Sequence, residues 1–406
     1  MSINNYPHTP KSASYDVIII GGATSGSSIA WFLSSNPDFN GRILVVERDP
    51  SLQFSATKAS NNCIRQQFAT SINVKIAQYG ASFIKDFHKN LDNDPNVPNI
   101  PIRNFGYLYL ADNQAFAKVL EEDRDLQASC GAGTRIVSRS EIAKKYPFYH
   151  LEDVVCGSLN TVDEGAFDAL GMVEWLRQKA TARGVEYVHS EVVAVGRAGD
   201  EIKTVTLKTG ETIAVGRVVN ASGTRAGQVA SMAGVNLPIE ARRRYTYIFE
   251  VDQPLDQDLP LTIDPTGVHL RSFGEKDYLV GCPPIGPDIA VDVDDFGYPE
   301  DVWNEKIFPV LAKRVPQFST ARITQSWVGH YEFNTFDHNA IIGPHTEVKN
   351  LLFCCGFSGH GSQQAPACGR ALAELIVYGA FRTLDLSDLL YNRIPSGRPI
   401  LERAVI

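Results

Sequence analysis

Glycine and other small residues form a tight turn near the start of the chain. The turn follows the G-x-G-x-x-G pattern at Gly21 and Gly26, but Ala23 occupies the middle position, where backbone must approach a pyrophosphate. Alanine adds only a methyl group, so this departure weakens the pattern slightly. Thr24 and Ser25 belong to this turn, and the helix expected from Gly26 onward would direct its N-terminus at the phosphates. The spacing therefore predicts a dinucleotide-binding turn.

An acidic residue stands at the distance from this turn that a nucleotide fold requires. Residues 17–20 predict a buried strand before the turn, and residues 42–46 predict a second strand that ends in Glu47. A carboxylate at that point can hold the ribose hydroxyls of adenosine, and Arg48 follows it. The alternative is a structural glycine turn in another α/β protein. These residues alone do not separate FAD from NAD.

Two later segments extend the same nucleotide site. Residues 216–220 predict a strand that runs into the small residues Ala221 and Gly223. Residues 351–355 predict another strand, and the glycine-rich segment 356–361 leads from it into a helix. The positive end of that helix suits the N1/C2 carbonyl side of an isoalloxazine, where negative charge appears on reduction, so FAD is favoured over NAD. The cofactor residues predicted here are Gly356, Ser358, Gly359, His360, Gly361, Ser362 and Gln363.

Several side chains outside the turns could act on a substrate. His360 lies between two glycines at the helix start, so its ring could donate to substrate or flavin, or could simply face solvent. Arg65 could clamp a carboxylate with two hydrogen bonds, or could form a surface salt bridge. In the run 242–244, strand alternation would direct Arg243 and Arg244 to opposite faces. One face could reach a substrate cavity, and a solvated edge strand is the alternative.

The length, net charge and composition of the chain exclude several classes of protein. A length of 406 residues suits two domains, and a net charge of −8 argues against nucleic acid as a partner. No apolar run approaches the roughly 18 residues of a membrane span. The seven cysteines include no CxxC pair, so neither a disulfide framework nor a metal site is indicated and a reducing, cytoplasmic compartment is expected. Residues 1–14 are expected to form a flexible lead.

In this order, the segments resemble the D-amino-acid oxidase-like family of FAD oxidoreductases, which includes glycine oxidase, sarcosine oxidases and dehydrogenases, and D-arginine dehydrogenase. Residues 64–68 (IRQQF), 331–337 (YEFNTFD) and 356–366 (GFSGHGSQQAP) are similar to a branch of FAD-dependent oxidoreductase domain-containing proteins. The resemblance covers nearly the whole chain. It implies FAD as the cofactor and an α/β plus α+β fold, with a Rossmann-type FAD domain and a substrate domain on a mixed or antiparallel sheet.

The resemblance also implies how the chain is divided. The FAD domain would comprise residues 15–87, 153–227 and 339–387, the substrate domain residues 88–152 and 228–338, and the C-terminal tail residues 388–406. The chain around Ser60 and Asn61 would run along the flavin ring, together with Arg65. The backbone of Val193 would meet the adenine.

One departure from the family concerns substrate recognition. In glycine oxidase-like members an arginine after a W-A-G-L sequence binds the substrate carboxylate, whereas here residues 327–330 (WVGH) precede Tyr331. A tyrosine can hydrogen-bond a carboxylate or orient an amine, or can be a half-buried aromatic at a strand end. Carboxylate binding would then fall to Arg65 or to Arg243 and Arg244, unless the substrate has no carboxylate.

The activity implied is oxidation of the C–N bond of a small amine or amino acid, N-alkylated or of D configuration. A neutral amine with its Cα–H over flavin N5 would lose hydride, and the imine would hydrolyse. Oxygen, a quinone or a carrier protein would take the electrons. The lysine beside the flavin in sarcosine oxidases has no counterpart in residues 278–281, so a dehydrogenase is favoured over an oxidase. A 2-hydroxy-acid dehydrogenase with His360 as base, and a flavin-containing assembly or scaffold protein without turnover, stay open.

Overall fold

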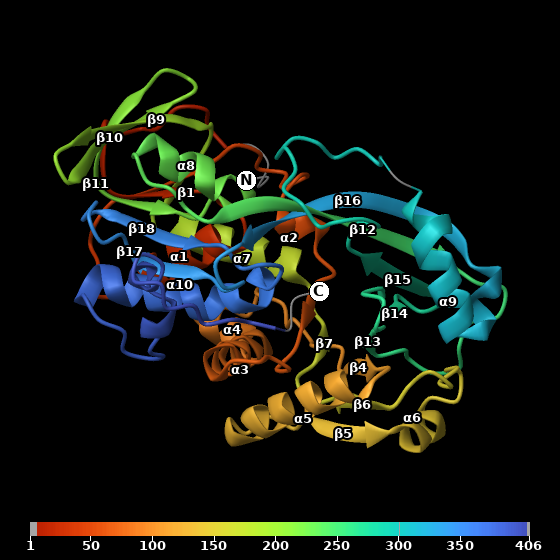
Figure 1. Ribbon diagram of the computed structural model, residues 1–406. Coiled ribbons are helices and arrows are strands. Elements are labelled where there is room, and N and C mark those ends of the chain that lie inside the picture. The colour runs from red at the N-terminus through yellow and green to blue at the C-terminus, as the bar shows by residue number, and fades with distance from the viewer. Residues whose placement is uncertain (1–5, 300, 404–406) are drawn as a thin grey trace.

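The computed structural model describes residues 6–299 and 301–403, and it is built on two large sheets (Figure 1). The first sheet has the order β17-β18-β11-β1-β2-β8, with β10 and β9 continuing from β11. Its strands are β1 (Ser14–Ile20), β2 (Ile43–Glu47), β8 (Glu186–His189), β9 (Val192–Ala198), β10 (Glu201–Leu207), β11 (Thr212–Asn220), β17 (Ile341–Pro344) and β18 (Leu351–Cys355).

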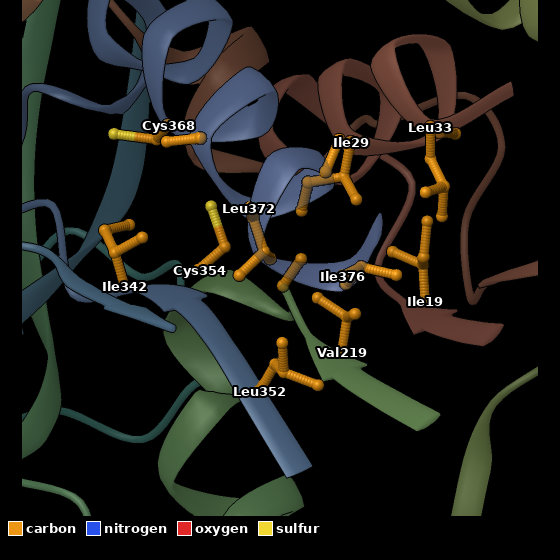
Figure 2. Close-up of a cluster of buried hydrophobic side chains, with 14 of the residues drawn as sticks. Ile19, Ile29, Leu33, Val219, Ile342, Leu352, Cys354, Cys368, Leu372 and Ile376 are labelled. Atoms are coloured by element: carbon orange, nitrogen blue, oxygen red, sulfur yellow. The ribbon is translucent and has the colours of Figure 1, made fainter. Parts of the chain in front are cut away.

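The centre of the first sheet is parallel, because β18, β11, β1, β2 and β8 all run in one direction. Its apolar strands are covered by helices, and Figure 2 shows the resulting core between the sheet and the helices α1 (Thr24–Ser34) and α10 (Gly361–Tyr378). The two helices touch closely, since a Cβ on Gly369 would lie 2.6 Å from the Cβ of Ser28. This arrangement confirms the predicted Rossmann-type fold.

The second sheet has the order β16-β12-β15-β14-β13-β4-β6-β5 and is antiparallel except between β13 and β4. The prediction of a mixed or antiparallel second sheet is therefore confirmed. Its strands are β4 (Tyr107–Ala111), β5 (Arg135–Ser138), β6 (Cys156–Asn160), β12 (Ile239–Glu250), β13 (Leu261–Ile263), β14 (His269–Phe273), β15 (Asp277–Cys282) and β16 (Arg322–Asn334). A short pair, β3 (Cys63–Ile64) with β7 (Gly165–Ala166), lies apart from both sheets.

The remaining helices surround the two sheets (Figure 1). They are α2 (Ala56–Ala59), α3 (Ser71–Lys85), α4 (Phe87–Asn90), α5 (Gln114–Ser129), α6 (Arg139–Lys145), α7 (Ala169–Ala182), α8 (Ala226–Met232) and α9 (Phe308–Arg314). Short helical turns are formed by Gly223–Arg225, Trp303–Ile307, Pro316–Thr320, Ser387–Leu389 and Tyr391–Arg393. Among the described helices, none has both the length and the apolar composition that a membrane crossing needs.

Strand pairing departs from the predicted division of the chain at one place. The strand β6 falls inside the segment 153–227 that was expected in the FAD domain, but it pairs with β4 and β5 of the second sheet. The other predicted domain boundaries stay predictions.

The terminal segments pack against the fold where the structure describes them. Residues 1–5 and 404–406 lie outside the described residues. Tyr6 stacks on Tyr187 of β8 with ring centroids 5.2 Å apart, so this part of the expected flexible lead is held against the first sheet. Near the other end, Glu402 is buried and accepts hydrogen bonds from the backbone N–H of Ala69 at 2.8 Å and from Asn73 Nδ2 at 2.9 Å.

Candidate functional site

A long cavity, called the central cavity below, lies where the carboxyl ends of the parallel strands meet the second sheet. Its first part is lined by the ends of β1 and β2 and by the segments that follow β11 and β18. Its second part is lined by residues of β4, β12, β13, β14 and β16. Ligands of open α/β sheets bind at this edge of the sheet. The central cavity is therefore the candidate site.

The central cavity brings together most of the residues predicted from the sequence. The predicted residues that line it are Gly21, Ala23, Thr24, Ser25, Glu47, Arg48, Ser60, Asn61, Arg65, Ala221, Gly223, Arg244, Tyr331, Ser358, Gly359, His360, Gly361, Ser362 and Gln363. Four predicted residues do not line it, and these are Gly26, Val193, Arg243 and Gly356.

For three of these four residues, a local cause explains why they do not line the cavity. A Cβ on Gly26 would lie 1.9 Å from the carbonyl oxygen of Gly21, so this glycine lets the turn pack on helix α1 instead of facing a ligand. Val193 is 46% exposed, and strand alternation leaves Val192 to line the cavity. Gly356 has φ +78° and donates its backbone N–H to Glu332 Oε2 at 2.9 Å.

The fourth residue belongs to the arginine run on β12. Arg243 is buried and pairs with Asp295, so it does not reach the cavity. Arg244 lines the cavity, but its guanidinium donates to both oxygens of Asp288, at 2.9 and 3.1 Å. Arg242 also lies within ion-pair distance of Asp288. Asp288 and Asp295, which belong to one loop, thus pair with all three arginines of the run.

That loop, residues 286–296, is called the strap below, and its residues Val293, Asp294 and Phe296 line the cavity. Asp294 pairs with Arg225 and approaches Arg48 at 3.6 Å. Phe296 stacks on His330 with ring centroids 4.3 Å apart. The arginine run therefore anchors the strap.

The nucleotide end of the cavity is shaped by Gly21 and Glu47. Gly21 has φ +100°, and a Cβ there would lie 2.4 Å from the carbonyl oxygen of Ala221, so only glycine fits between the turn and the end of β11. Glu47 is buried and accepts from the backbone N–H of Gly22 at 2.7 Å and of Asp49 at 2.8 Å. Burial raises the pKa of Glu47.

Two long helices point their N-termini at the cavity. Helix α1 begins after Ala23 and helix α10 begins after His360, and neither of these N-cap residues makes a capping hydrogen bond with its side chain. Neither helix has an acidic residue in its first turn. Uncapped N–H groups with a positive helix dipole suit a pyrophosphate at one end and the carbonyl side of a flavin at the other. This donor set fits FAD.

Arg65 and His360 meet in the second part of the cavity. Arg65 is 3% exposed, donates from Nε to the backbone oxygen of Gln67 at 3.1 Å, and lies 3.0 Å from His360 Nε2 through Nη2. Because a guanidinium can only donate, Nε2 of His360 accepts and the imidazole is neutral in this contact. The Arg65 guanidinium also lies over the ring of Phe68, 4.6 Å from its centroid.

Tyr331 faces the same region. Its hydroxyl oxygen accepts a hydrogen bond from Arg244, whose guanidinium lies 4.2 Å above the ring centroid. Burial raises the pKa of Tyr331 to about 12, so the phenol stays protonated near neutral pH and can donate.

The sequence did not single out two buried residues that line the cavity, His269 and Glu332. Burial lowers the pKa of His269 to about 4, so its imidazole is neutral. Burial raises the pKa of Glu332 to about 7, although the N–H groups of Gly356 and Phe357 oppose this shift. Single residues within strands carry no motif, and only the packing of the two sheets brings them to the cavity.

Comparisons with known proteins agree with this geometry. Residues 16–375 match the family described as DAO: FAD dependent oxidoreductase. The chain is 34% identical to FAD-dependent oxidoreductase domain-containing protein 1 of Xenopus laevis, over 96% of this chain and 85% of the relative. It is 25% identical to the mitochondrial sarcosine dehydrogenase of Mus musculus, over 92% of this chain but 41% of that protein.

A solved structure shares the fold across the whole molecule. The L-proline dehydrogenase of P. horikoshii superposes with a TM-score of 0.82 at 24% identity, covering 97% of this chain and all of that one. The prediction of FAD as the cofactor is confirmed by the family match. The chain belongs to the FAD dependent oxidoreductase family.

Proposed function

We propose that this protein oxidises the C–N bond of a small amino acid, N-alkylated or of D configuration, to an imine that water hydrolyses. The observation that carries the proposal is a buried arginine, Arg65, in the same cavity as the nucleotide segments. Sarcosine dehydrogenase and L-proline dehydrogenase, both named for amino acids with a secondary amine, support this substrate class.

Arg65 binds the substrate carboxylate in this proposal. Its hydrogen bonds to the backbone oxygen of Gln67 and to Nε2 of His360 orient the guanidinium. A planar guanidinium oriented in this way matches a carboxylate with two parallel hydrogen bonds. Arg244 is less suited because Asp288 already takes the same positions.

The surroundings of the cavity favour the neutral amine that hydride loss requires. Arg65 is positive, and a nearby positive charge disfavours a protonated amine. The protonated hydroxyl of Tyr331 is a donor that can orient the substrate.

FAD is proposed to occupy the length of the central cavity. Glu47 would hold the adenosine ribose, the turn at Gly21 and the start of helix α1 would hold the pyrophosphate, and the start of helix α10 would face the isoalloxazine. When bound, FAD supplies the hydride acceptor. Val293, Asp294 and Phe296 of the strap line the cavity and would cover the bound cofactor.

The contact between Arg65 and His360 weighs against a 2-hydroxy acid as substrate. Removing hydride from an alcohol carbon requires a base for the hydroxyl proton. His360 was the candidate base, but its Nε2 accepts from Arg65 in this structure. Oxidation of a neutral amine does not need such a base, so the amine is preferred.

A dehydrogenase is proposed over an oxidase. The described residues lining the cavity include the arginines Arg48, Arg65, Arg225 and Arg244 but no lysine. A mobile ammonium beside the flavin, of the kind implied by the resemblance to sarcosine oxidases, is therefore not among the lining groups. A quinone or a carrier protein is the proposed electron acceptor.

The proposal is tested by anaerobic mixing of the FAD-loaded protein with four ligand classes. These are N-methyl and cyclic secondary amino acids, D-amino acids, amines without a carboxylate, and 2-hydroxy acids. Loss of flavin absorbance with one of the first two classes is expected. Reduction by hydroxy acids alone, or by none of the four, would contradict the proposed function, and rapid peroxide formation in air would contradict the proposed acceptor.

A further inference from the structure

Glu164 is a buried carboxylate that the reaction described above does not use. It is 0% exposed and lies between β6 and β7. Its Oε1 accepts from the backbone N–H of Gln66 at 2.7 Å and from Asn160 Nδ2 at 2.9 Å, and its Oε2 accepts from Gln67 Nε2 at 2.8 Å. All three donors are neutral. A buried charge held by neutral donors is costly, so its presence needs an explanation.

Gln67 connects this carboxylate to Arg65. Further hydrogen bonds hold the Gln67 amide. Its Nε2 also donates to the backbone oxygen of Tyr107 at 3.1 Å, and its Oε1 accepts from Ser158 at 2.8 Å. The backbone oxygen of Gln67 accepts from Arg65 Nε at 3.1 Å. The group that orients the guanidinium is thus itself held by Glu164.

We propose that Glu164 is a positioning residue, which holds the segment 65–67 so that the Arg65 guanidinium meets the substrate carboxylate. The inference rests on the proposed function, in which Arg65 binds that carboxylate. Glu164 acts through Gln66 and Gln67 and touches neither substrate nor cofactor in this account. Burial raises the pKa of Glu164 to about 7, and its ionised form attracts the Arg65 guanidinium across the buried segment.

The hydrogen bonds predict what an uncharged replacement would do. In Glu164→Gln one oxygen becomes an NH2 group, which cannot accept from Gln67 Nε2. Turning the Gln67 amide around would restore that contact, but it would aim the Gln67 oxygen at the carbonyl oxygen of Tyr107. Either outcome loosens the segment that orients Arg65, while the nucleotide end of the cavity is untouched.

The experiment compares FAD-loaded wild type with Glu164→Gln, Gln67→Ala, Arg65→Gln and Asp163→Asn. Acetate and benzoate are titrated against the flavin absorbance, and KM and kcat are measured on an amino acid identified by the substrate screen. Asp163 is the matched control, because it belongs to the same turn but pairs with Lys85 at 2.8 Å, away from Arg65. Should Glu164→Gln fail to fold, Gln67→Ala removes the same connection and leaves the carboxylate in place.

Glu164→Gln and Gln67→Ala are expected to raise the Kd for both carboxylates about ten-fold, the loss of roughly one hydrogen bond. KM should rise similarly while kcat changes less, and FAD content and Asp163→Asn should match wild type. If Glu164→Gln and Gln67→Ala bind the carboxylates as wild type does, while Arg65→Gln loses that binding, the positioning role of Glu164 is wrong and the clamp is unaffected. Wild-type binding by Arg65→Gln would overturn the proposed clamp and the inference with it.

Discussion

Arg65 differs from the other arginines of the central cavity in what orients it. Asp288 engages Arg244, and Asp294 lies between Arg225 and Arg48. The hydrogen bonds of Arg65 to Gln67 and His360 go to neutral atoms. An acidic partner such as Asp288 competes with a ligand for the N–H groups of Arg244.

This difference gives the first prediction. Arg65→Gln should lower kcat/KM on a carboxylate substrate. The loss of transition-state binding should be about 2–5 kcal/mol, because a buried ion pair is lost. Arg244→Gln should cost less, since Asp288 already competes for that guanidinium. Steady-state kinetics on both variants, with FAD content measured as the control, make the comparison. Equal losses in the two variants would show that Arg65 is not the clamp.

A second prediction concerns Glu332. Its pKa is about 7 in the folded protein against 4.5 for the free side chain, so the folded state binds its proton more tightly than the unfolded state does. Proton binding at Glu332 therefore makes its full contribution to the free energy of unfolding below about pH 4.5, and this contribution is lost as the pH rises through 7. The loss approaches about 3 kcal/mol at most.

Glu332→Gln removes this titration and keeps an acceptor for the N–H of Gly356. The Tm of the variant, measured relative to wild type by thermal unfolding from pH 5 to pH 8, should therefore increase with pH. A difference in Tm that stays constant across this range would show that Glu332 does not titrate there.

At the scale of the elements, apolar runs and small-residue turns made the FAD-binding half predictable. The expected strands at residues 17–20, 42–46 and 351–355 fall on β1, β2 and β18, because buried parallel strands are continuously apolar. The strap was not predicted, since it has no periodicity. Alternation on β12 placed Arg243 and Arg244 on opposite faces, but only the acidic strap shows why Arg243 is buried.

The strap gives the third prediction. Arg243→Gln removes the partner of Asp295 and should loosen one wall of the cavity, so FAD should dissociate faster. The pairs of Asp294 with Arg48 and Arg225 are partly exposed, and salt screens exposed pairs, so FAD release from wild type should also increase with ionic strength.

Release is measured as the increase in free FAD fluorescence after dilution into buffers of different salt concentration. Arg322→Gln is the matched control, because Arg322 pairs with Glu250 and Asp252 on an exposed stretch of β16 outside the cavity lining. FAD release that is equal in the Arg243 and Arg322 variants would mean that the strap does not retain the cofactor.

At the scale of the whole molecule, the cavity belongs to both sheets. Its nucleotide part is lined by the ends of β1 and β2, and its second part by β12, β14 and β16. Sequence motifs marked the first part because phosphate binding demands glycine at fixed spacing, as at Gly21. His269 and Glu332 reach the cavity from β14 and β16, which are distant in the sequence, and no local pattern encodes that arrangement.

The fourth prediction follows from this shared lining. A ligand that binds only the folded protein stabilises it, by about 2.7 kcal/mol at a free concentration 100 times its Kd. FAD contacts in both halves of the cavity should therefore raise the unfolding temperature of both sheets together.

Calorimetry of the protein stripped of FAD and then titrated with it tests this prediction. If the two sheets unfold independently, the stripped protein should show two unfolding transitions. Saturating FAD should raise the temperatures of both transitions. A transition that keeps its temperature at all FAD concentrations would indicate that one sheet makes no contribution to cofactor binding.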